Sequence, residues 1–323
     1  MRRMMMAAAA ATAMFAWTGA EAADITIKAG HSNAPGEVQD EGLKQFKQRV
    51  EAATQGRAAI DIYPSMQLGN EIQMVEGLLL GTLDMTVPSN AAFSNFVTEF
   101  RVFDMPFLFR DPAHLERVVD GPVFDELKAA AAKKNIRLLG IYSSGIRHIM
   151  TKEPINSIAD LKGKKIRTMQ NPVHVEAFKA FGANATALAY GELYGALQTG
   201  VVDGAEAANT NYNAQRFYEV AKNWAMVGWL HLTAPLVISE RKFAALPPDV
   251  QKAITEAGME SSKWERRFVI DSDKPLLDRI KGQGITVTTP DPEPFRQASK
   301  QVYEKMLTSE TDKKLLMMIL DTK

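Results

Sequence analysis

The order of local patterns along the chain constrains the fold more than any other feature. Residues 25–29 alternate as in a strand, residues 40–54 place apolar side chains on one helical face, and residues 58–63 alternate again. A helical pattern over 71–80 and a strand pattern over 83–87 follow. This β-α-β-α-β order predicts a parallel sheet with right-handed crossovers and helices on both faces.

The same alternation returns in the second half of the chain. Strand patterns are expected over 136–142, 148–151 and 165–169, and helical patterns over 173–181 and 192–198. A glycine follows both helical patterns, as is typical of a helix end. Because one domain commonly holds about 100–200 residues, two such units predict two lobes.

A long helical pattern extends over 248–282. An element of about 30 residues is about 45 Å long, which is enough to run along both lobes. Pro275 is expected to kink or split this helix. Since open parallel sheets bind ligands beyond the carboxyl ends of their strands, the cleft between the lobes is the expected site.

The N-terminus has the three parts of a secretory signal peptide over residues 1–23. Arg2 and Arg3 precede an apolar run over 4–17, and small residues follow at Ala20 and Ala22. The apolar run is shorter than the roughly 17–25 residues that span a bilayer. Cleavage is therefore expected after residue 22 or 23.

Composition narrows the possible functions. The chain has no cysteine, which excludes disulfides, Cys-ligated metal centres, a thiol nucleophile and a lipid-anchoring thiol. Its 38 basic and 38 acidic side chains balance, and this argues against a nucleic-acid binder. With the signal peptide, these features predict a freely soluble periplasmic protein.

Two arginines at strand positions, Arg147 and Arg167, are candidate ligand-binding residues. The planar guanidinium matches a carboxylate through two parallel hydrogen bonds. A surface or salt-bridged arginine is nevertheless the commoner case for such a pattern, and sequence spacing does not decide between the two.

Small polar side chains follow two of the expected strands. Ser89 and Asn90 come after the third strand, and Asn209 and Asn211 come after Glu206. Hydroxyls and amides there can bind the hydroxyl groups of a sugar, but they suit turns and helix caps equally well. Both interpretations stay open.

The patterns of common enzymes are missing from the sequence. It has no Gly-x-Ser-x-Gly elbow, no P-loop and no His-Glu-x-x-His, and its five histidines form no i,i+3 or i,i+4 pair. We therefore expect no catalytic residue, no metal and no cofactor.

Four segments, 63–69, 104–109, 169–174 and 191–204, closely resemble the extracytoplasmic solute-binding subunits of TRAP (tripartite ATP-independent periplasmic) transporters, the DctP-like family. The resemblance covers essentially the whole mature chain. It implies the two-lobed α/β fold of periplasmic binding proteins, in which each lobe is a mainly parallel sheet flanked by helices and a long helix spans both.

The resemblance also implies the boundaries and the function. Lobe I would hold residues 24–144 plus 233–272, and lobe II residues 145–232 plus 273–323. A monomer would close on a small carboxylate, such as a C4-dicarboxylate, sugar acid, 2-oxo acid or aromatic acid. It would deliver this ligand to the small and large TRAP membrane subunits. The binding protein of an ATP-driven importer, or a periplasmic hydrolase or lyase, are the alternatives.

By resemblance, Arg167 forms a salt bridge with the ligand carboxylate, Arg147 adds a second contact and Tyr190 packs against the ligand. The remaining residues of the expected site are polar and comprise Gln170, Ser89, Asn90, Glu206, Asn209, Asn211 and His31. One position departs from the family, because its usual asparagine after Glu206 is Ala207 here. Either Asn209 and Asn211 replace that amide or the pocket suits a different acid.

Overall fold

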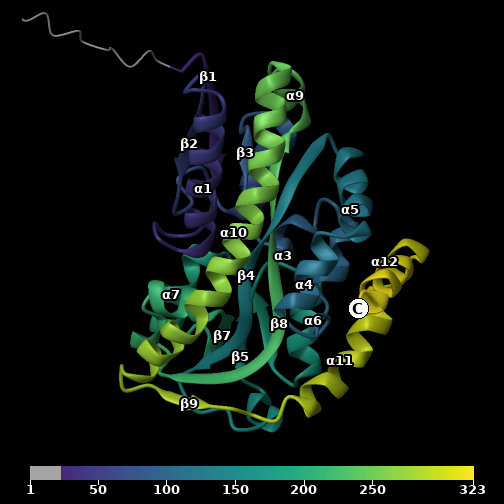
Figure 1. Ribbon diagram of the computed structural model, residues 1–323. Coiled ribbons are helices and arrows are strands. Elements are labelled where there is room, and N and C mark those ends of the chain that lie inside the picture. Colours follow the sequence, from purple (N-terminus) through teal and green to yellow (C-terminus); the bar gives the residue numbers. More distant parts are fainter. Residues whose placement is uncertain (1–22) are drawn as a thin grey trace, which may run out of the picture.

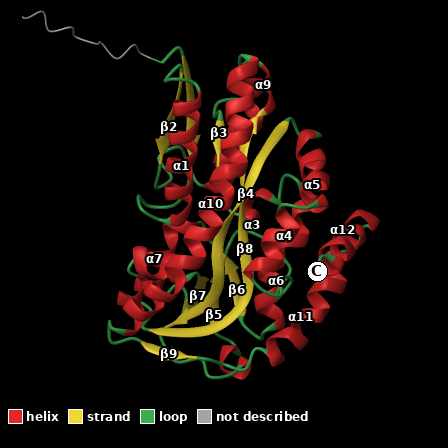
Figure 2. Cartoon of the chain, viewed as in Figure 1, coloured by secondary structure: helices red, strands yellow, loops and turns green. Residues whose placement is uncertain are grey.

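The computed structural model describes residues 23–323, so the first 22 residues of the predicted signal peptide lie outside the described range. Within that range the strands form one nine-stranded sheet in the order β2–β1–β3–β8–β4–β7–β5–β6, with β9 beside β8. Helices pack around this sheet (Figure 2). The strands are β1 (Ile25–Gly30), β2 (Ala58–Tyr63), β3 (Met85–Thr86), β4 (Ile136–Thr151), β5 (Lys165–Thr168), β6 (Asn184–Ala187), β7 (Gly204–Ala207), β8 (Asn223–Ser239) and β9 (Thr286–Thr288).

Each end of the sheet is a small parallel unit. β1 pairs in parallel with β2 and β3, and β5 pairs in parallel with β6 and β7. We call these units, with their flanking helices, the β1 end and the β5 end. They correspond to the two repeats of the strand–helix order in the sequence, so the predicted two-lobed α/β fold is confirmed.

Two long strands, β4 and β8, connect the two ends. They run antiparallel to each other and also pair with β3 and β7, which makes the whole sheet mixed. The sequence pattern predicted separate strands over 136–142 and 148–151 and did not indicate a strand over 223–239. The split was wrong because the strand continues past Gly145, where φ is 78° and the pairing register shifts. Gly228 on β8 has φ 64° beside a similar shift.

The helices alternate with the strands as predicted in both units. Gly81 ends the second helix in the left-handed conformation, with φ 75°. The helices are α1 (Val38–Ala53), α2 (Glu71–Leu80), α3 (Asn90–Phe93), α4 (Pro112–Val119), α5 (Pro122–Ala132), α6 (Pro172–Ala180), α7 (Leu193–Thr199), α8 (Asn209–Ala214), α9 (Glu240–Ala244), α10 (Pro248–Lys281), α11 (Glu293–Met306) and α12 (Glu310–Asp321), with 3-10 turns η1 (Thr98–Asp104), η2 (Ile158–Leu161), η3 (Tyr190–Glu192) and η4 (Phe217–Glu219).

Helix α10 runs from the β1 end to the β5 end (Figure 1). It has 34 residues, and a helix of that length is about 50 Å long. Ser143 on β4 donates its backbone N–H to Glu265 at 2.7 Å, and Asn209 donates its amide to Asp273 at 3.0 Å, so the helix is bonded to both units. Of the kink or split predicted at Pro275, the split does not occur, since the helix continues through this exposed position. The carbonyl oxygen one turn earlier, which loses its N–H donor, can turn to water there.

Two glycines let α10 approach β4 closely. A Cβ added at Gly258 would lie 2.7 Å from the Cβ of Leu139 and 2.8 Å from its carbonyl oxygen. A Cβ at Gly140 would lie 2.8 Å from the carbonyl oxygen of Gly258. Because backbone atoms are involved, a side chain at either position has to push the helix away from the strand.

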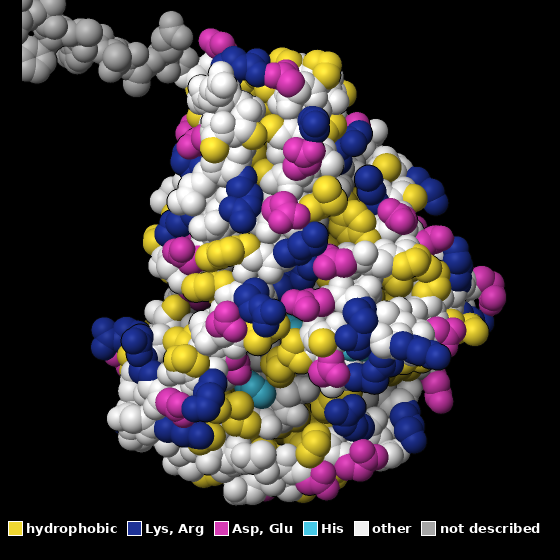
Figure 3. Space-filling view, viewed as in Figure 1, with side chains coloured by type: hydrophobic (Ala, Val, Ile, Leu, Met, Phe, Trp, Pro, Cys, Tyr) yellow, Lys and Arg dark blue, Asp and Glu magenta, His cyan; other side chains and the backbone are white. Residues whose placement is uncertain are grey.

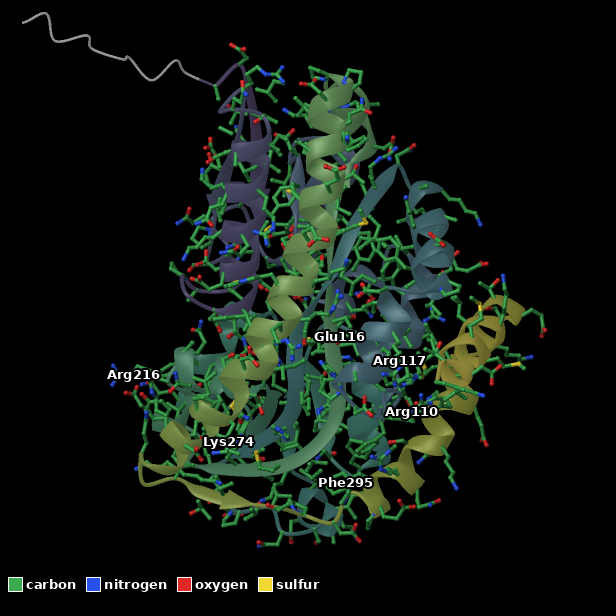
Figure 4. The ribbon with its side chains drawn as sticks, in the orientation of Figure 1. Arg110, Glu116, Arg117, Arg216, Lys274 and Phe295 are labelled. Carbon is green, nitrogen blue, oxygen red and sulfur yellow. The ribbon has the colours of Figure 1, made fainter. Side chains whose placement is uncertain are left out.

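The C-terminal helix is held to the body of the protein by Arg110, which precedes α4. Its guanidinium donates to the carbonyl oxygens of Leu320, at 3.3 Å, and of Thr322. A cation at this end also offsets the partial negative charge of the helix C-terminus. Figure 4 shows Arg110 beside α12, and Figure 3 shows basic and acidic side chains interspersed on the same face.

We expect Gly258→Ala to lower the free energy of unfolding by about 1–3 kcal/mol, the usual cost of overpacking a tight contact. Gly195→Ala is the matched control, because an added Cβ in that helix meets no atom within 4 Å. It should be neutral or stabilise by up to about 1 kcal/mol. Urea unfolding at neutral pH measures both changes, and equal effects would contradict the close approach.

The buried His148 on β4 makes stability depend on pH. Burial, with a smaller contribution from Arg147, lowers the pKa of His148 from 6.5 to about 3. The unfolded chain therefore takes up a proton below pH 6.5 that the folded chain does not, so falling pH favours unfolding. His148→Gln keeps an acceptor for the N–H of Gly228, which now donates to Nδ1 at 3.0 Å.

Between pH 7 and pH 4.5, the wild-type protein should lose about 2 kcal/mol of unfolding free energy relative to His148→Gln. Urea titrations of both proteins at the two pH values measure this difference. If the difference in unfolding free energy between the two proteins is the same at both pH values, His148 is protonated in the folded protein at pH 4.5.

Candidate functional site

Two small cavities lie between the β1 end and the β5 end, past the carboxyl ends of β1, β3 and β5. This is the place where open parallel sheets bind ligands. The first cavity, of about 20 Å³, is lined by Ser32, Asn33, Gln39, Glu71, Ser89, Ser144, Arg147, Met169, Tyr190, Asn211 and Leu232. The second, of about 10 Å³, is lined by Met66, Glu71, Ala92, Arg167, Met169, Gln170, Leu188, Ala189 and Tyr190.

The two cavities are parts of one cleft, since Glu71, Met169 and Tyr190 line both. The cleft is narrow: about 10–15 Å³ is the space that a single water needs, so its two parts together have room for about two waters. Six of the predicted site residues line it: Arg147, Arg167, Tyr190, Gln170, Asn211 and Ser89.

A buried carboxylate joins the two predicted arginines. Glu206 is on β7, between β4 with Arg147 and β5 with Arg167. Its Oε2 accepts from Nε of Arg147 at 2.6 Å, and its Oε1 accepts from Nη1 of Arg167 at 3.4 Å. All three side chains are at most 2% exposed. Burial by itself raises the pKa of Glu206, but the two arginines outweigh it and hold the pKa below its ordinary value.

The guanidinium of Arg167 keeps hydrogen-bonding capacity toward the cleft. Nε and Nη2 donate to the carbonyl oxygen of Leu188 at 3.0 and 2.8 Å, and Nη1 donates to Glu206. Since a guanidinium has five N–H groups, these contacts within the described range leave one on Nη1 and one on Nη2. Two such N–H groups can bind a carboxylate through parallel hydrogen bonds.

The guanidinium of Arg147 is positioned by the second unit of the fold. Its Nη1 donates to Oδ1 of Asn211 at 2.8 Å, and its Nη2 donates weakly to the backbone oxygen of Glu206 at 3.3 Å. Both arginines are thus salt-bridged and also line the cleft, so the two interpretations that the sequence left open are compatible.

Glu37, which the sequence did not indicate, joins the two ends across the cleft. It precedes α1, and its Oε1 accepts from the hydroxyl of Tyr190 at 3.2 Å and from Nδ2 of Asn211 at 3.0 Å. Its Oε2 accepts from Nε2 of Gln215 at 3.1 Å and from the N–H of Ala34 at 2.5 Å. Burial outweighs these hydrogen bonds and raises the pKa of Glu37.

Glu71, the first residue of α2, is the second side chain at the cleft that the sequence did not indicate. Its Oε1 accepts from the hydroxyl of Ser32 at 3.0 Å and from the N–H of Ser89 at 2.9 Å. Its Oε2 accepts from the hydroxyl of Ser89 at 2.7 Å. An acidic residue is common in the first turn of a helix because its negative charge interacts favourably with the partial positive charge of the helix N-terminus. The sequence therefore carried no separate signal for a position at the cleft.

Four predicted residues do not line the cleft, and one of them is Glu206, which lies behind the two arginines. Asn90 donates its amide to the carbonyl oxygen of Phe100 at 3.0 Å, and Nε2 of His31 lies 3.3 Å from Oδ1 of Asp40. Asn209 accepts from the indole of Trp224 at 2.9 Å and donates to α10.

Asn211, but not Asn209, contacts Arg147, and Ala207 is buried in β7. The turn after β7 leads into α8, so consecutive polar residues there point in different directions. Of the two asparagines, only Asn211 lines the cleft, and whether it replaces the missing asparagine or the pocket suits a different acid stays a prediction.

One protein family matches most of this chain. The family described as bacterial extracellular solute-binding protein, family 7 (DctP), matches residues 29–310. The 2,3-diketo-L-gulonate-binding periplasmic protein of Escherichia coli is 31% identical over 265 residues, which cover 82% of this chain and 81% of that protein.

Solved structures agree in fold. A TRAP periplasmic solute-binding protein of Xanthobacter autotrophicus with bound β-D-galacturonate is 30% identical, with a TM-score of 0.89 over 92% of this chain and all of that one. A TRAP protein of Sulfurospirillum deleyianum with bound succinate is 31% identical, with a TM-score of 0.87 over 93% of this chain and all of that one.

We expect Glu206→Gln to lower the free energy of unfolding by about 3–5 kcal/mol, because it leaves two buried guanidiniums without a counter-charge. Asp278→Asn is the control, since it removes one carboxylate from an exposed pair with Lys274 and should change stability by at most about 0.5 kcal/mol. Urea unfolding measures both. A loss as small for Glu206→Gln as for the control would contradict the role of Glu206.

Proposed function

The chain belongs to family 7 of the bacterial extracellular solute-binding proteins, and from this we propose that it captures a small organic acid in the periplasm for a TRAP membrane permease. The family is periplasmic and consists of solute-binding proteins. No helix within residues 23–323 is long and apolar enough to cross a membrane. Removal of the N-terminal signal peptide would release the chain as a free carrier.

One observation carries the proposal: two buried arginines share a single carboxylate at the cleft. Two guanidiniums against Glu206 leave one positive charge without a partner in this triad. A ligand carboxylate supplies the negative charge that balances it, and the free N–H groups of Arg167 can bind the two carboxylate oxygens through parallel hydrogen bonds. Exclusion of water from the closed cleft strengthens such a bond. The neighbouring Tyr190 would cover the ligand, and Gln170, Ser89 and Asn211 would bind its polar groups.

Ligand entry requires the two ends to separate, because the closed cleft is far smaller than a sugar acid. We propose that lobe I comprises residues 24–144 plus 233–272 and lobe II residues 145–232 plus 273–323. The register shifts beside Gly145 and Gly228 support a hinge where β4 and β8 cross between the lobes. Glu37 would hold the closed form through its bonds to the opposite lobe.

We expect Arg167→Ala to weaken binding of the cognate acid about 100-fold, because the ligand carboxylate then enters the cleft without its cation. Lys274→Ala removes an exposed cation from α10 (Figure 4) and should leave affinity unchanged. A thermal-shift screen of organic acids first identifies the ligand, since an acid at 100 times its Kd adds about 2.7 kcal/mol of stability.

Calorimetry with that acid then compares the wild-type protein with the two variants. Equal affinity of Arg167→Ala and the wild-type protein would refute the assignment of the carboxylate site. No stabilisation by any acid in the screen would refute the proposed function itself.

A further inference from the structure

We propose that the protein has a second ligand site, separate from the cleft, which binds a small aromatic anion and is complete only when the two ends of the sheet are together. The site is a cavity of about 270 Å³ beside helix α10, and we call it the α10 cavity. Its volume is close to the lower end of the roughly 300–1,000 Å³ that small-molecule sites occupy.

Three separate parts of the fold form the α10 cavity. Residues 36–38, at the start of α1, belong to the β1 end, and residues 210, 213 and 214 of α8 belong to the β5 end. The third part is one side of α10 between residues 268 and 279, where Figure 4 labels Lys274. A ligand in this cavity contacts both ends, so it binds better to the form in which they are together and favours that form.

The inner wall of the α10 cavity is largely apolar. Val38 is buried, and Phe268 and Leu276 are half-buried on α10. The ring of Phe268 stacks on that of Trp264, with the ring centroids 5.1 Å apart, and this contact restricts its movement. A flat aromatic ring can pack against these side chains, and the burial of its apolar surface favours binding.

One buried polar group of this wall has no hydrogen-bonding partner among the described residues. Thr210 is 7% exposed, and its hydroxyl makes no hydrogen bond there. The next residue, Asn211, bonds to Arg147 and Glu37 and lines the cleft instead. Because a buried hydroxyl without a partner costs free energy, a polar atom on the ligand is favoured beside Thr210.

The charges around the α10 cavity favour an anion at its exposed side. Arg279 lines the cavity, is exposed and joins no ion pair within residues 23–323. Glu37 is buried in the opposite wall, and its two oxygens already accept four hydrogen bonds, which fill the about four acceptor positions of a carboxylate. An anionic group therefore binds beside Arg279, with the aromatic ring further inside.

The probe 6-hydroxynaphthalene-2-sulfonate has the three features that the cavity calls for: a flat ring, a hydroxyl and an anionic group. Its neutral comparator is the corresponding sulfonamide. Calorimetry on the mature wild-type protein should give the sulfonate a Kd of about 1 mM or less, as expected for a molecule of this size. The sulfonate should bind about threefold more tightly than the sulfonamide, the usual effect of one exposed ion pair.

Three variants locate the probe. Thr210→Val removes the hydroxyl but no hydrogen bond of the described structure, so it should fold normally and bind the probe at least threefold more weakly. Arg279→Gln should abolish the preference for the sulfonate over the sulfonamide. Lys281→Gln is the matched control, because it removes an exposed cation from the same turn of α10 that does not line the cavity.

Spin labels test whether the probe brings the two ends together. Since the chain has no cysteine, labels can be attached to Glu76→Cys on α2 and Val201→Cys after α7, two exposed positions at different ends of the sheet. The probe alone should move the distance distribution between the labels towards the distance of the closed structure. An acid in the cleft favours the same form, so the two ligands should bind cooperatively, and this last step alone rests on the proposed function.

The outcomes separate the second site from the cleft. Arg167→Ala should bind the probe as the wild-type protein does. Loss of the probe in Arg167→Ala, with unchanged affinity in Thr210→Val and Arg279→Gln, would place it in the cleft and overturn the inference. A probe that does not bind, or that leaves the label distances unchanged, would overturn it as well. If no organic acid stabilises the protein but the probe binds as described, the proposed function falls and the second site stands.

Discussion

The buried triad of Arg147, Glu206 and Arg167 is the interaction on which the rest of the site depends. Burying a charge costs free energy, and a buried pair of one cation and one anion leaves no net charge for a ligand to balance. Three neighbouring strands instead place two guanidiniums on one carboxylate, so this triad has one positive charge in excess. In the proposed function, this excess charge is what an organic acid binds.

The same architecture supports the proposed opening of the site. β4 and β8 pass through both units, so the units stay covalently and structurally connected while their loops face each other across the cleft. Glycines with positive φ lie on both strands, and α10 bonds to both units. Glu37 is bound by neutral donors from the opposite unit and is buried without a cation, a state that separation of the units would relieve.

Local patterns predicted the elements that depend on local chemistry. Strand alternation, the glycine that ends α2 and the length of α10 all follow from period and from helix-end preferences, and the structure confirms them. The split of β4 was wrong because a glycine normally interrupts a strand, and only pairing with β8 on the other side carries the strand past Gly145. The residues after β7 were also ambiguous. Without the position of α8, the sequence did not indicate whether the side chain of Asn209 or that of Asn211 faces the cleft.

The sequence by itself determined the class of fold and the family and offered the two arginines as candidates, because periodic patterns and short characteristic segments are properties of neighbouring residues. Tertiary structure alone decided which polar side chains face the cleft. Glu71 and Glu37 are far from the arginines in the chain and look like ordinary residues at helix starts. Their contacts arise only when the fold brings together four distant segments, at β1, β3, β5 and α8. No local sequence pattern predicts the distance between separate elements.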